Sequence, residues 1–205
     1  MADTLTFYTN PMSRGRIARW MLEEVGQPYD TVIVEWGVEN PALKAINPMH
    51  KVPTIQHGDR VVTECAAVCA YLADAFPQVG LAPPLDDRAA YYRWLFFGAG
   101  PIEAATTDKA LGIVVPDDKK AMVGYGDLGR VVDTLEGALA GREFIAGDRF
   151  SAADLYIASH LGWAMMFNSI ESRPVFTDYV GRHFARPAHV RANEIDDALI
   201  PQKDG

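Results

Sequence analysis

The sequence predicts two units of different fold class, a mixed α/β unit followed by an all-helical unit. Strand and helix patterns alternate over the first third of the chain, whereas strand patterns nearly vanish after residue 86. Between these regions, residues 77–86 contain three prolines and no periodicity, which indicates a linker. We therefore expect a first domain at residues 1–78, a linker at 79–86 and a second domain at 87–205.

The first unit shows both periodicities. Thr4 to Tyr8 alternates between polar and apolar residues, which predicts a strand, and a four-residue apolar spacing from Ser13 onward predicts a helix that Gly26 ends. The other elements expected here are a strand at 29–34, a short helix at 41–46, a hairpin with strands at 51–55 and 61–63, and a helix at 64–76. Strands interleaved with helices imply a mixed sheet covered by helices.

The second unit reads as helical throughout. The expected helices lie at 87–105, 117–139, 152–169 and 174–184. Ser151 and Asp154 have the Ser-x-x-Asp spacing of a capping box, which serves folding rather than catalysis. Residues 124–129 spell the Gly-x-Gly-x-x-Gly pattern of dinucleotide-binding proteins, but a helical pattern precedes them where that motif needs a strand. We expect a helix start or a connection there, and no nucleotide site.

The bulk composition narrows the partners. Hydrophobic residues make up 49% of the chain and charged residues 22%, which is typical of a globular interior. The net charge of −8 and the lack of a basic cluster argue against nucleic acid and anionic membranes. No apolar run approaches the roughly 18 residues of a membrane span, and no secretory signal is visible. Cys65 and Cys69 form neither a disulfide framework nor a zinc site, so we expect a reducing cytoplasm and no metal.

Six segments of the chain carry recognisable short patterns: residues 8–15, 20–26, 47–53, 63–67, 150–154 and 186–188. In this order and at these spacings they resemble the cytosolic glutathione transferases, over nearly the whole chain. The Pro-Met-Ser piece of the first segment is close to the form found in the phi class of that family. The resemblance implies a thioredoxin-like first domain, an all-helical second domain, glutathione as co-substrate with no further cofactor, a homodimer and a role in detoxification.

The implied reaction needs the thiolate of glutathione, and a free cysteine thiol has a pKa of about 8.5. A hydroxyl at a helix N-terminus supplies a hydrogen-bond donor and positive potential, and both lower the pKa of a nearby thiol. Ser13 has this place and is our expected catalytic residue, although a serine there can also simply cap the helix. Tyr8 is the rival, because other classes of the family use a tyrosine near the end of the first strand.

The second expected part of the glutathione site is the segment before the predicted hairpin. By resemblance, the backbone of Val52 pairs with the cysteinyl unit of glutathione, like an added strand, and Pro53 follows a cis peptide bond. Lys51 suits the glycyl carboxylate as a compact positive charge, or is an ordinary solvated lysine. His50 stands where the family usually has glycine, so it either reaches the glutathione site or tolerates the turn.

The third expected part is the start of the helix at 64–76. A helix N-terminus is a ready anion site for the γ-glutamyl carboxylate, and Glu64 is suited to the ammonium group, or is merely well placed in a first helical turn. The family usually has serine where this chain has Cys65. Because a thiol is a weaker donor than a hydroxyl, we expect reduced affinity or more reliance on backbone N–H groups.

The expected function is conjugation of the glutathione thiolate to small hydrophobic electrophiles, in a pocket to which Met12, Trp36, Phe97 and Pro101 contribute. Two alternatives remain open. One is a glutathione-dependent thiol reductase or peroxidase, although serine rather than cysteine opens the first helix. The other is a non-catalytic glutathione transferase-like binding protein, which nothing in the sequence excludes.

Overall fold

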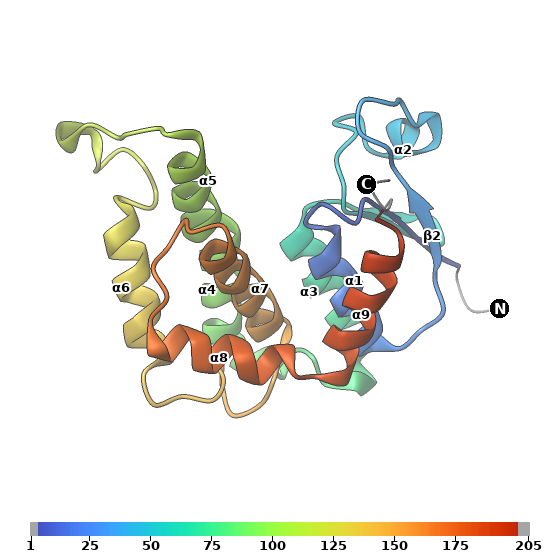
Figure 1. The fold of residues 1–205 in the computed structure, drawn as a ribbon. Helices are drawn as coiled ribbons and strands as arrows, with labels where there is room; N and C mark the ends of the chain where they lie inside the picture. The colour runs from blue at the N-terminus through green and yellow to red at the C-terminus, as the bar shows by residue number, and fades with distance from the viewer. Residues whose placement is uncertain (1–3, 201–205) are drawn as a thin grey trace. The chain divides into compact units, whose positions relative to one another are not determined.

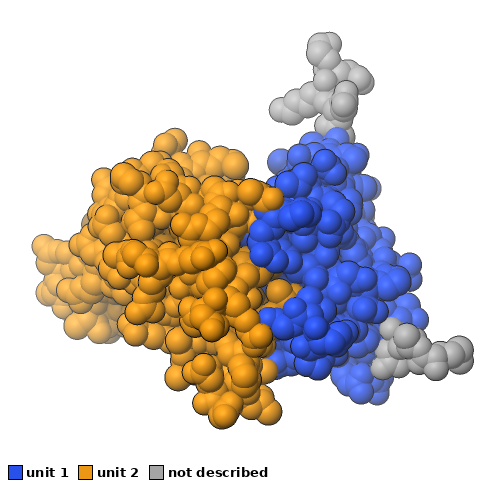
Figure 2. Space-filling view, turned by 90° about the horizontal axis from the view of Figure 1, so that it is seen from below, with its two compact units in different colours: residues 1–80, 186–205 blue, residues 81–185 orange. Residues whose placement is uncertain are grey.

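We describe the fold from a computed structural model, in which residues 4–200 are placed well enough to describe (Figure 1). The chain divides into two compact units, coloured separately in Figure 2. Unit 1 comprises residues 1–80 and 186–205, and unit 2 comprises residues 81–185. None of the helices within residues 4–200 is long and apolar enough to cross a membrane.

Unit 1 is built on a four-stranded mixed sheet with the order β2-β1-β3-β4. β1 pairs with β2 in parallel, with β3 antiparallel, and β3 and β4 form the expected hairpin. The mixed sheet predicted from the sequence is therefore confirmed. The bounds of its strands are β1 Leu5–Thr9, β2 Asp30–Ile33, β3 Thr54–His57 and β4 Arg60–Val62.

Three helices of the first 80 residues pack around this sheet: α1 (Gly15–Val25), α2 (Pro41–Ile46) and α3 (Cys65–Ala75). α1 ends as predicted, because Gly26 adopts the left-handed conformation at its C-cap. α2 begins at Pro41 behind the Asn40 side chain, which accepts a hydrogen bond from Leu43 N–H. Short 3₁₀ turns at Pro77–Val79 and Leu85–Asp87 occupy the predicted linker.

The last helix, α9 (Pro187–Ala198), packs on α1, and Figure 1 shows the two side by side. The sequence-based division assigns this helix to the second domain, whereas the compact units group it with the first. Ion pairs join the two helices. Arg19 of α1 and Asp196 of α9, both fully buried, lie 2.8 Å apart.

Unit 2 is helical, as predicted, but only the helix predicted at 174–184 has the predicted bounds. The helix predicted at 152–169 ends at Met166. The predicted helix at 87–105 is observed as α4, a π-helical segment and α5, which continues to Leu111. The predicted helix at 117–139 is wrong over its first half, because glycines interrupt it and Asp127 caps a later start at Leu128. The bounds are α4 Ala89–Phe97, η3 Gly98–Ile102, α5 Glu103–Leu111, α6 Leu128–Leu139, α7 Ala152–Met166 and α8 Pro174–Phe184.

The capping box at the start of α7 is confirmed. The Asp154 carboxylate accepts hydrogen bonds from Ser151 N–H at 2.9 Å, from the Ser151 hydroxyl at 3.0 Å, from Ile145 N–H at 2.7 Å and from the Tyr179 hydroxyl at 2.7 Å. Burial raises the pKa of Asp154, against the opposing effect of these donors. This network ties the start of α7 to the loop before it and to α8.

Candidate functional site

Three segments that are distant in sequence meet at one edge of the sheet in unit 1. β1 ends and β3 begins at this edge, since Tyr8 lies opposite Thr54. The starts of α1 and α3 lie beside each other, because Cys65 Sγ donates to the carbonyl oxygen of Arg14 at 3.5 Å. The structure therefore brings together residues 8–15, 51–53 and 64–65, as the sequence analysis required of a glutathione site.

Asn10 organises the loop between β1 and α1, a role that the sequence analysis missed. Its side-chain oxygen accepts from Met12 N–H at 2.9 Å, and its side-chain nitrogen donates to the carbonyl of Val34 at 2.8 Å. Its own carbonyl accepts from Ser13 N–H at 3.1 Å. The available signal was an asparagine between a strand and a proline, which favours this kind of local turn.

Ser13 lies half-buried just before the N-terminus of α1. Its Oγ accepts from Gly15 N–H at 2.9 Å and donates to the carbonyl of Asn10 at 2.7 Å. Ser13 therefore stabilises the start of α1 by accepting a hydrogen bond from Gly15 N–H. This bond uses one lone pair of the hydroxyl oxygen and does not use its proton. The hydroxyl proton reaches another acceptor by rotating about the Cβ–Oγ bond, away from Asn10.

Gly15 allows the first turn of α1 to lie close to the end of β1. A Cβ atom at position 15 would lie 1.9 Å from Thr9 Oγ1 and 3.0 Å from Ser13 Oγ. The first turn of α1 therefore sits against the end of β1 more closely than any side chain allows. This close approach fixes Ser13 between the strand and the helix.

Tyr8 is only 7% exposed and packs with Val34 and Leu43, beside Val52 and Ile46. This packing places its ring in the cluster with α2. Tyr8 therefore lines the sheet near the loop that carries Ser13.

The segment at residues 51–53 is held from below by two buried side chains that the sequence analysis did not single out. Asn47 donates to the carbonyl of Lys51 and to Thr54 Oγ1, both at 3.0 Å, and Thr54 donates to the same carbonyl at 2.9 Å. The Val52–Pro53 peptide bond is cis, as the resemblance implied. The Lys51 side chain is exposed and makes no ion pair within the described part of the chain.

His50 has φ of 54°, a left-handed conformation that glycine adopts most readily. Its Nε2 accepts a hydrogen bond from Asn40 N–H at 2.9 Å. An accepting Nε2 carries no proton, so the proton of the neutral ring is on Nδ1. His50 therefore braces the loop before α2 against the segment at residues 51–53, and its side chain is already committed to that contact.

Glu64 and Cys65 begin α3 with different environments. Glu64 has φ of 65° and ψ of 115°, and its carboxylate is exposed and accepts only a long 3.4 Å bond from Thr63 among the contacts described. Cys65 is 7% exposed, and its thiol faces Arg14. The carboxylate is accessible to a ligand, whereas the thiol is largely covered by protein.

The residues expected at the electrophile pocket belong to both units. In unit 1, Met12 and Trp36 are 70% and 60% exposed. In unit 2, Phe97 and Pro101 are partly buried at the junction of α4 with the π-helical segment. Such exposed apolar side chains suit contact with an apolar ligand.

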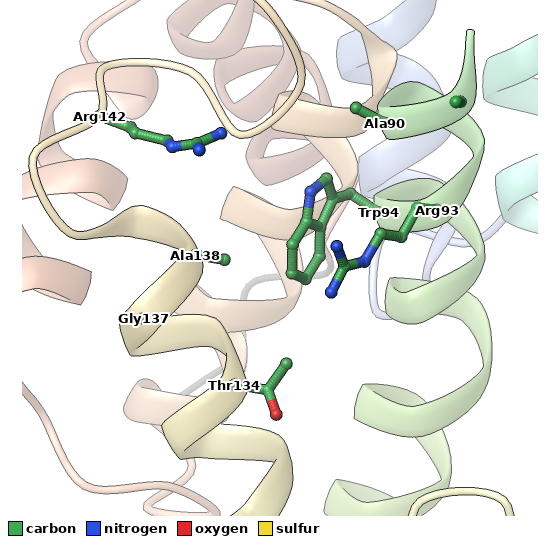
Figure 3. Close-up of a pocket in the computed structure, with 8 residues that line it drawn as sticks. Ala90, Arg93, Trp94, Thr134, Gly137, Ala138 and Arg142 are labelled. Carbon is green, nitrogen blue, oxygen red and sulfur yellow. The ribbon is translucent and has the colours of Figure 1, made fainter.

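Unit 2 also contains a cavity of about 540 Å³ between α4 and α6 (Figure 3). Arg93, Trp94 and Arg142 point into it, with the Arg93 guanidinium 4.6 Å from the centre of the Trp94 ring. None of the predicted site residues lines this cavity. Among residues 4–200, no three His, Cys, Asp or Glu side chains are grouped so that they could hold a metal ion.

Comparison with known proteins gives the same family for both halves of the chain. The profile described as glutathione S-transferase, N-terminal domain, matches residues 12–75. The profile described as glutathione S-transferase, C-terminal domain, matches residues 102–187. A maize (Zea mays) protein named glutathione S-transferase 3 is 28% identical over 202 residues, covering 92% of this chain and 86% of the relative.

Solved structures agree over almost the full length. A glutathione transferase from Methylococcus capsulatus is 30% identical, with a TM-score of 0.79, covering 96% of this chain and all of that chain. A sphingomonad glutathione S-transferase, solved in complex with glutathione, is 28% identical, with a TM-score of 0.76, covering 94% of this chain and 98% of that one.

Proposed function

The chain is a glutathione transferase, a member of the glutathione transferase family over both of its matched domains, and from that premise we propose that Ser13 activates the glutathione thiol for attack on small hydrophobic electrophiles. One observation carries the proposal. The Ser13 hydroxyl stands half-buried beside the start of α1, where one lone pair accepts from Gly15 N–H and its proton is donated to the carbonyl oxygen of Asn10.

The physical case rests on the stability of the bound thiolate. A hydroxyl donor and the positive end of a helix both favour the negative sulfur over the neutral thiol. The sulfur would take the place of the Asn10 carbonyl as acceptor of the Ser13 proton. The exchange leaves the bond from Gly15 N–H in place, so the helix start is retained while the thiolate is bound.

The remaining contacts to glutathione are proposed from the same edge of unit 1. Val52 offers its backbone to the cysteinyl unit beside Pro53, and Lys51 offers its exposed ammonium to the glycyl carboxylate. Glu64 and the N–H groups that begin α3, at Cys65, receive the γ-glutamyl end. His50 acts indirectly, by bracing the segment at 51–53 through Asn40.

Several wider features are proposed on the family resemblance. These are residues 1–78 as the glutathione-binding domain, a homodimer, a cytoplasmic location, a role in detoxification, and no cofactor beyond glutathione as co-substrate. The identity of the electrophile is left to experiment, with Met12, Trp36, Phe97 and Pro101 as the candidates for contacting it.

Two assays test the proposal. Retention on glutathione resin measures binding, and turnover of a chloronitrobenzene probe measures conjugation. We expect both for the wild-type protein and a sharp loss of turnover in Ser13→Ala, with a modest loss in Tyr8→Phe. The reverse ranking would assign activation to Tyr8. Retention without turnover across a broad electrophile panel would identify a binding protein.

A Cys65→Ser/Cys69→Ser variant separates conjugation from disulfide exchange. A reductase that uses these thiols loses disulfide-reducing activity in this variant, since a thiolate must attack the disulfide sulfur. Conjugation through Ser13 survives the change. Loss of conjugation in a folded double variant would show that the proposed assignment of the chemistry is wrong.

A further inference from the structure

Arg16 joins the loop that carries Ser13 to the last helix of the chain. Its Nε donates to the carbonyl of Pro11 at 2.7 Å. Its Nη1 donates to Asn193 Oδ1 at 3.2 Å, and its Nη2 pairs with the carboxylate of Asp197. One planar guanidinium therefore contacts the loop at one edge and α9 at the other.

The Arg16 contact is the loop-proximal end of a row of charges that we call the α1–α9 seam. Next along the seam is the buried Arg19–Asp196 pair, at 2.8 Å. Glu24 accepts two bonds from Arg186, at 2.6 and 2.8 Å, and Glu23 pairs with Arg191 at 3.3 Å. The seam residues are Arg16, Arg19, Glu23, Glu24, Arg186, Arg191, Asn193, Asp196 and Asp197.

Four charges of the seam stand at helix ends where an isolated helix disfavours them. The positive end of a helix dipole is its N-terminus, yet Arg16 lies in the first turn of α1 and Arg186 precedes α9. Glu24 and Asp197 lie in the last turns, where cations are preferred. Each misplaced charge is matched by one of opposite sign across the seam. The pattern makes sense as interhelical pairing and opposes the preference of each helix alone.

We propose that Arg16 is a positioning residue, through which α9 holds the loop of residues 10–13 and sets the place of the Ser13 hydroxyl. This proposal rests on the proposed role of Ser13. The Arg16 side chain is 21% exposed, and its Nε donates to the backbone carbonyl of Pro11, two positions before Ser13. Its two outer nitrogens are fixed by Asn193 and Asp197, so the guanidinium can hold Pro11 only in one orientation.

The consequence should appear in turnover more than in glutathione binding. Within residues 4–200, the hydrogen bonds and ion pairs of the seam do not reach the proposed subsites at Lys51, Val52 and Glu64, so we expect ground-state binding of the peptide to be largely retained. The distance from Ser13 to the sulfur depends on the loop, and small misplacements at a reacting centre reduce rate strongly. Loss of the α9 side of the Arg16 contact should therefore lower kcat while KM for glutathione changes little.

The chain offers a matched control at the far end of the seam. Arg191→Ala also removes an ion pair between α1 and α9, but its partner Glu23 lies two turns from the loop. The test variant is Asn193→Ala/Asp197→Asn, which removes both α9 acceptors and leaves Arg16 in place. A purely structural role of the seam predicts similar effects of the two variants.

The first measurement is amide hydrogen exchange at Ser13 and Gly15 in the protein without glutathione. We expect exchange about tenfold faster in the Asn193/Asp197 variant and unchanged in Arg191→Ala, since loosening should be local to the loop. Equal changes in the two variants, or none, would overturn the proposal. Because no glutathione is present, this readout stands even if Ser13 proves not to activate the thiol.

The second measurement is steady-state kinetics with glutathione and the chloronitrobenzene probe. We expect kcat to fall about fivefold to tenfold in the Asn193/Asp197 variant, with KM for glutathione within about twofold of the wild-type value. Arg16→Ala should show the same loss, and combining it with the Asn193/Asp197 changes should add little further. Full additivity of the two losses would show that Arg16 and α9 act separately, against the proposal.

Discussion

Two helices of this protein have a serine beside their start and a charged residue three positions after that serine, and they use the serine differently. Ser151 directly precedes α7, whose first turn contains Asp154, whereas Ser13 lies two residues before α1, whose first turn contains Arg16. At α7 both residues are buried, and the carboxylate accepts the serine hydroxyl. At α1 the third residue is a cation that cannot accept a proton, and its guanidinium turns to Pro11 instead.

The difference indicates what makes a serine at a helix start available to a substrate. A carboxylate three residues later accepts a hydrogen bond from the serine hydroxyl, so the hydroxyl is fully used within the protein and serves stability. An arginine there leaves the hydroxyl on a backbone carbonyl, from which a stronger acceptor such as a thiolate can draw it. A serine side chain near a helix start is therefore compatible with either role. The two serines differ in the residue three positions later and in the exposure of the helix start.

The largest effect is expected at the closed network. Asp154→Ala leaves Ser151 N–H, Ile145 N–H and the Tyr179 hydroxyl buried without their acceptor. We expect the free energy of unfolding to fall by about 4 kcal/mol, since each unsatisfied buried group costs about 1–3 kcal/mol. Urea denaturation measures this loss. Ser151→Ala is the matched control, with an expected loss of about 1 kcal/mol.

The pH dependence of the same network has a defined sign. Burial raises the folded-state pKa of Asp154 above the unfolded value. A carboxyl group of this kind stabilises the fold most below its unfolded pKa, and that contribution is lost as the pH rises through the folded pKa. The stability of wild type relative to Asp154→Asn should therefore decrease as the pH rises above about 4, the ordinary pKa of an aspartic acid. A relative stability that increases over this range would contradict the raised pKa.

The next effect is expected at the open helix start. Ser13→Ala should lower kcat/KM for conjugation about 100-fold, the scale of losing one hydrogen bond to a developing anion, while stability falls by only about 1 kcal/mol. Tyr8→Phe should change kcat/KM by less than about threefold, since its ring contacts remain. A Ser13→Ala variant that loses stability as Asp154→Ala does, with its activity intact, would remove the distinction between the two serines.

Gly15→Ala tests how closely α1 must approach β1. The added Cβ would meet Thr9 Oγ1 at 1.9 Å, so the first turn has to move and carry Ser13 with it. We expect kcat/KM to fall about 30-fold and the unfolding free energy to fall by about 2 kcal/mol. Thr9→Ala/Gly15→Ala removes the nearest atom and should recover part of both losses. No recovery in the double variant would place the conflict elsewhere.

Local signals predicted the fold where capping residues and prolines set the ends of elements. α2 and α8 occupy the predicted residues, 41–46 and 174–184, and each begins with a proline at its first helical position. The predicted helix at 117–139 was wrong in its first half. Its apolar spacing did not outweigh Gly124 and Gly126, the latter in the left-handed region, so Asp127 begins the helix instead.

The sequence predicted the three segments of the candidate site, but not the side chains that hold those segments in place. The three segments were found because each has a short pattern of its own. Asn10 and Arg16 were missed because their partners lie 24 and 181 positions away, at Val34 and Asp197. The spacing of residues in a single sequence does not reveal contacts between positions so far apart. Their residue types alone, an asparagine after a strand and an arginine in a first turn, gave only weak local hints.

The smallest effect is expected at His50, where side chain and backbone can be tested apart. His50→Ala removes the acceptor of Asn40 N–H and keeps a strained φ of 54°, whereas His50→Gly removes the acceptor and relieves the strain. We expect both to raise KM for glutathione about threefold to fivefold through a looser segment at 51–53. The glycine variant should be more stable than the alanine variant by about 1 kcal/mol.

His57→Ala serves as the control for this experiment, because His57 ends β3 and contacts Tyr71 at 2.8 Å, away from the segment at 51–53. Its KM for glutathione should stay at the wild-type value. If His50→Gly binds glutathione as well as wild type does, the ring at position 50 merely tolerates a turn that glycine makes more easily. If both His50 variants bind more weakly, this chain has replaced the usual glycine with a brace, and the stability lost to the strained backbone is offset by a better-held site.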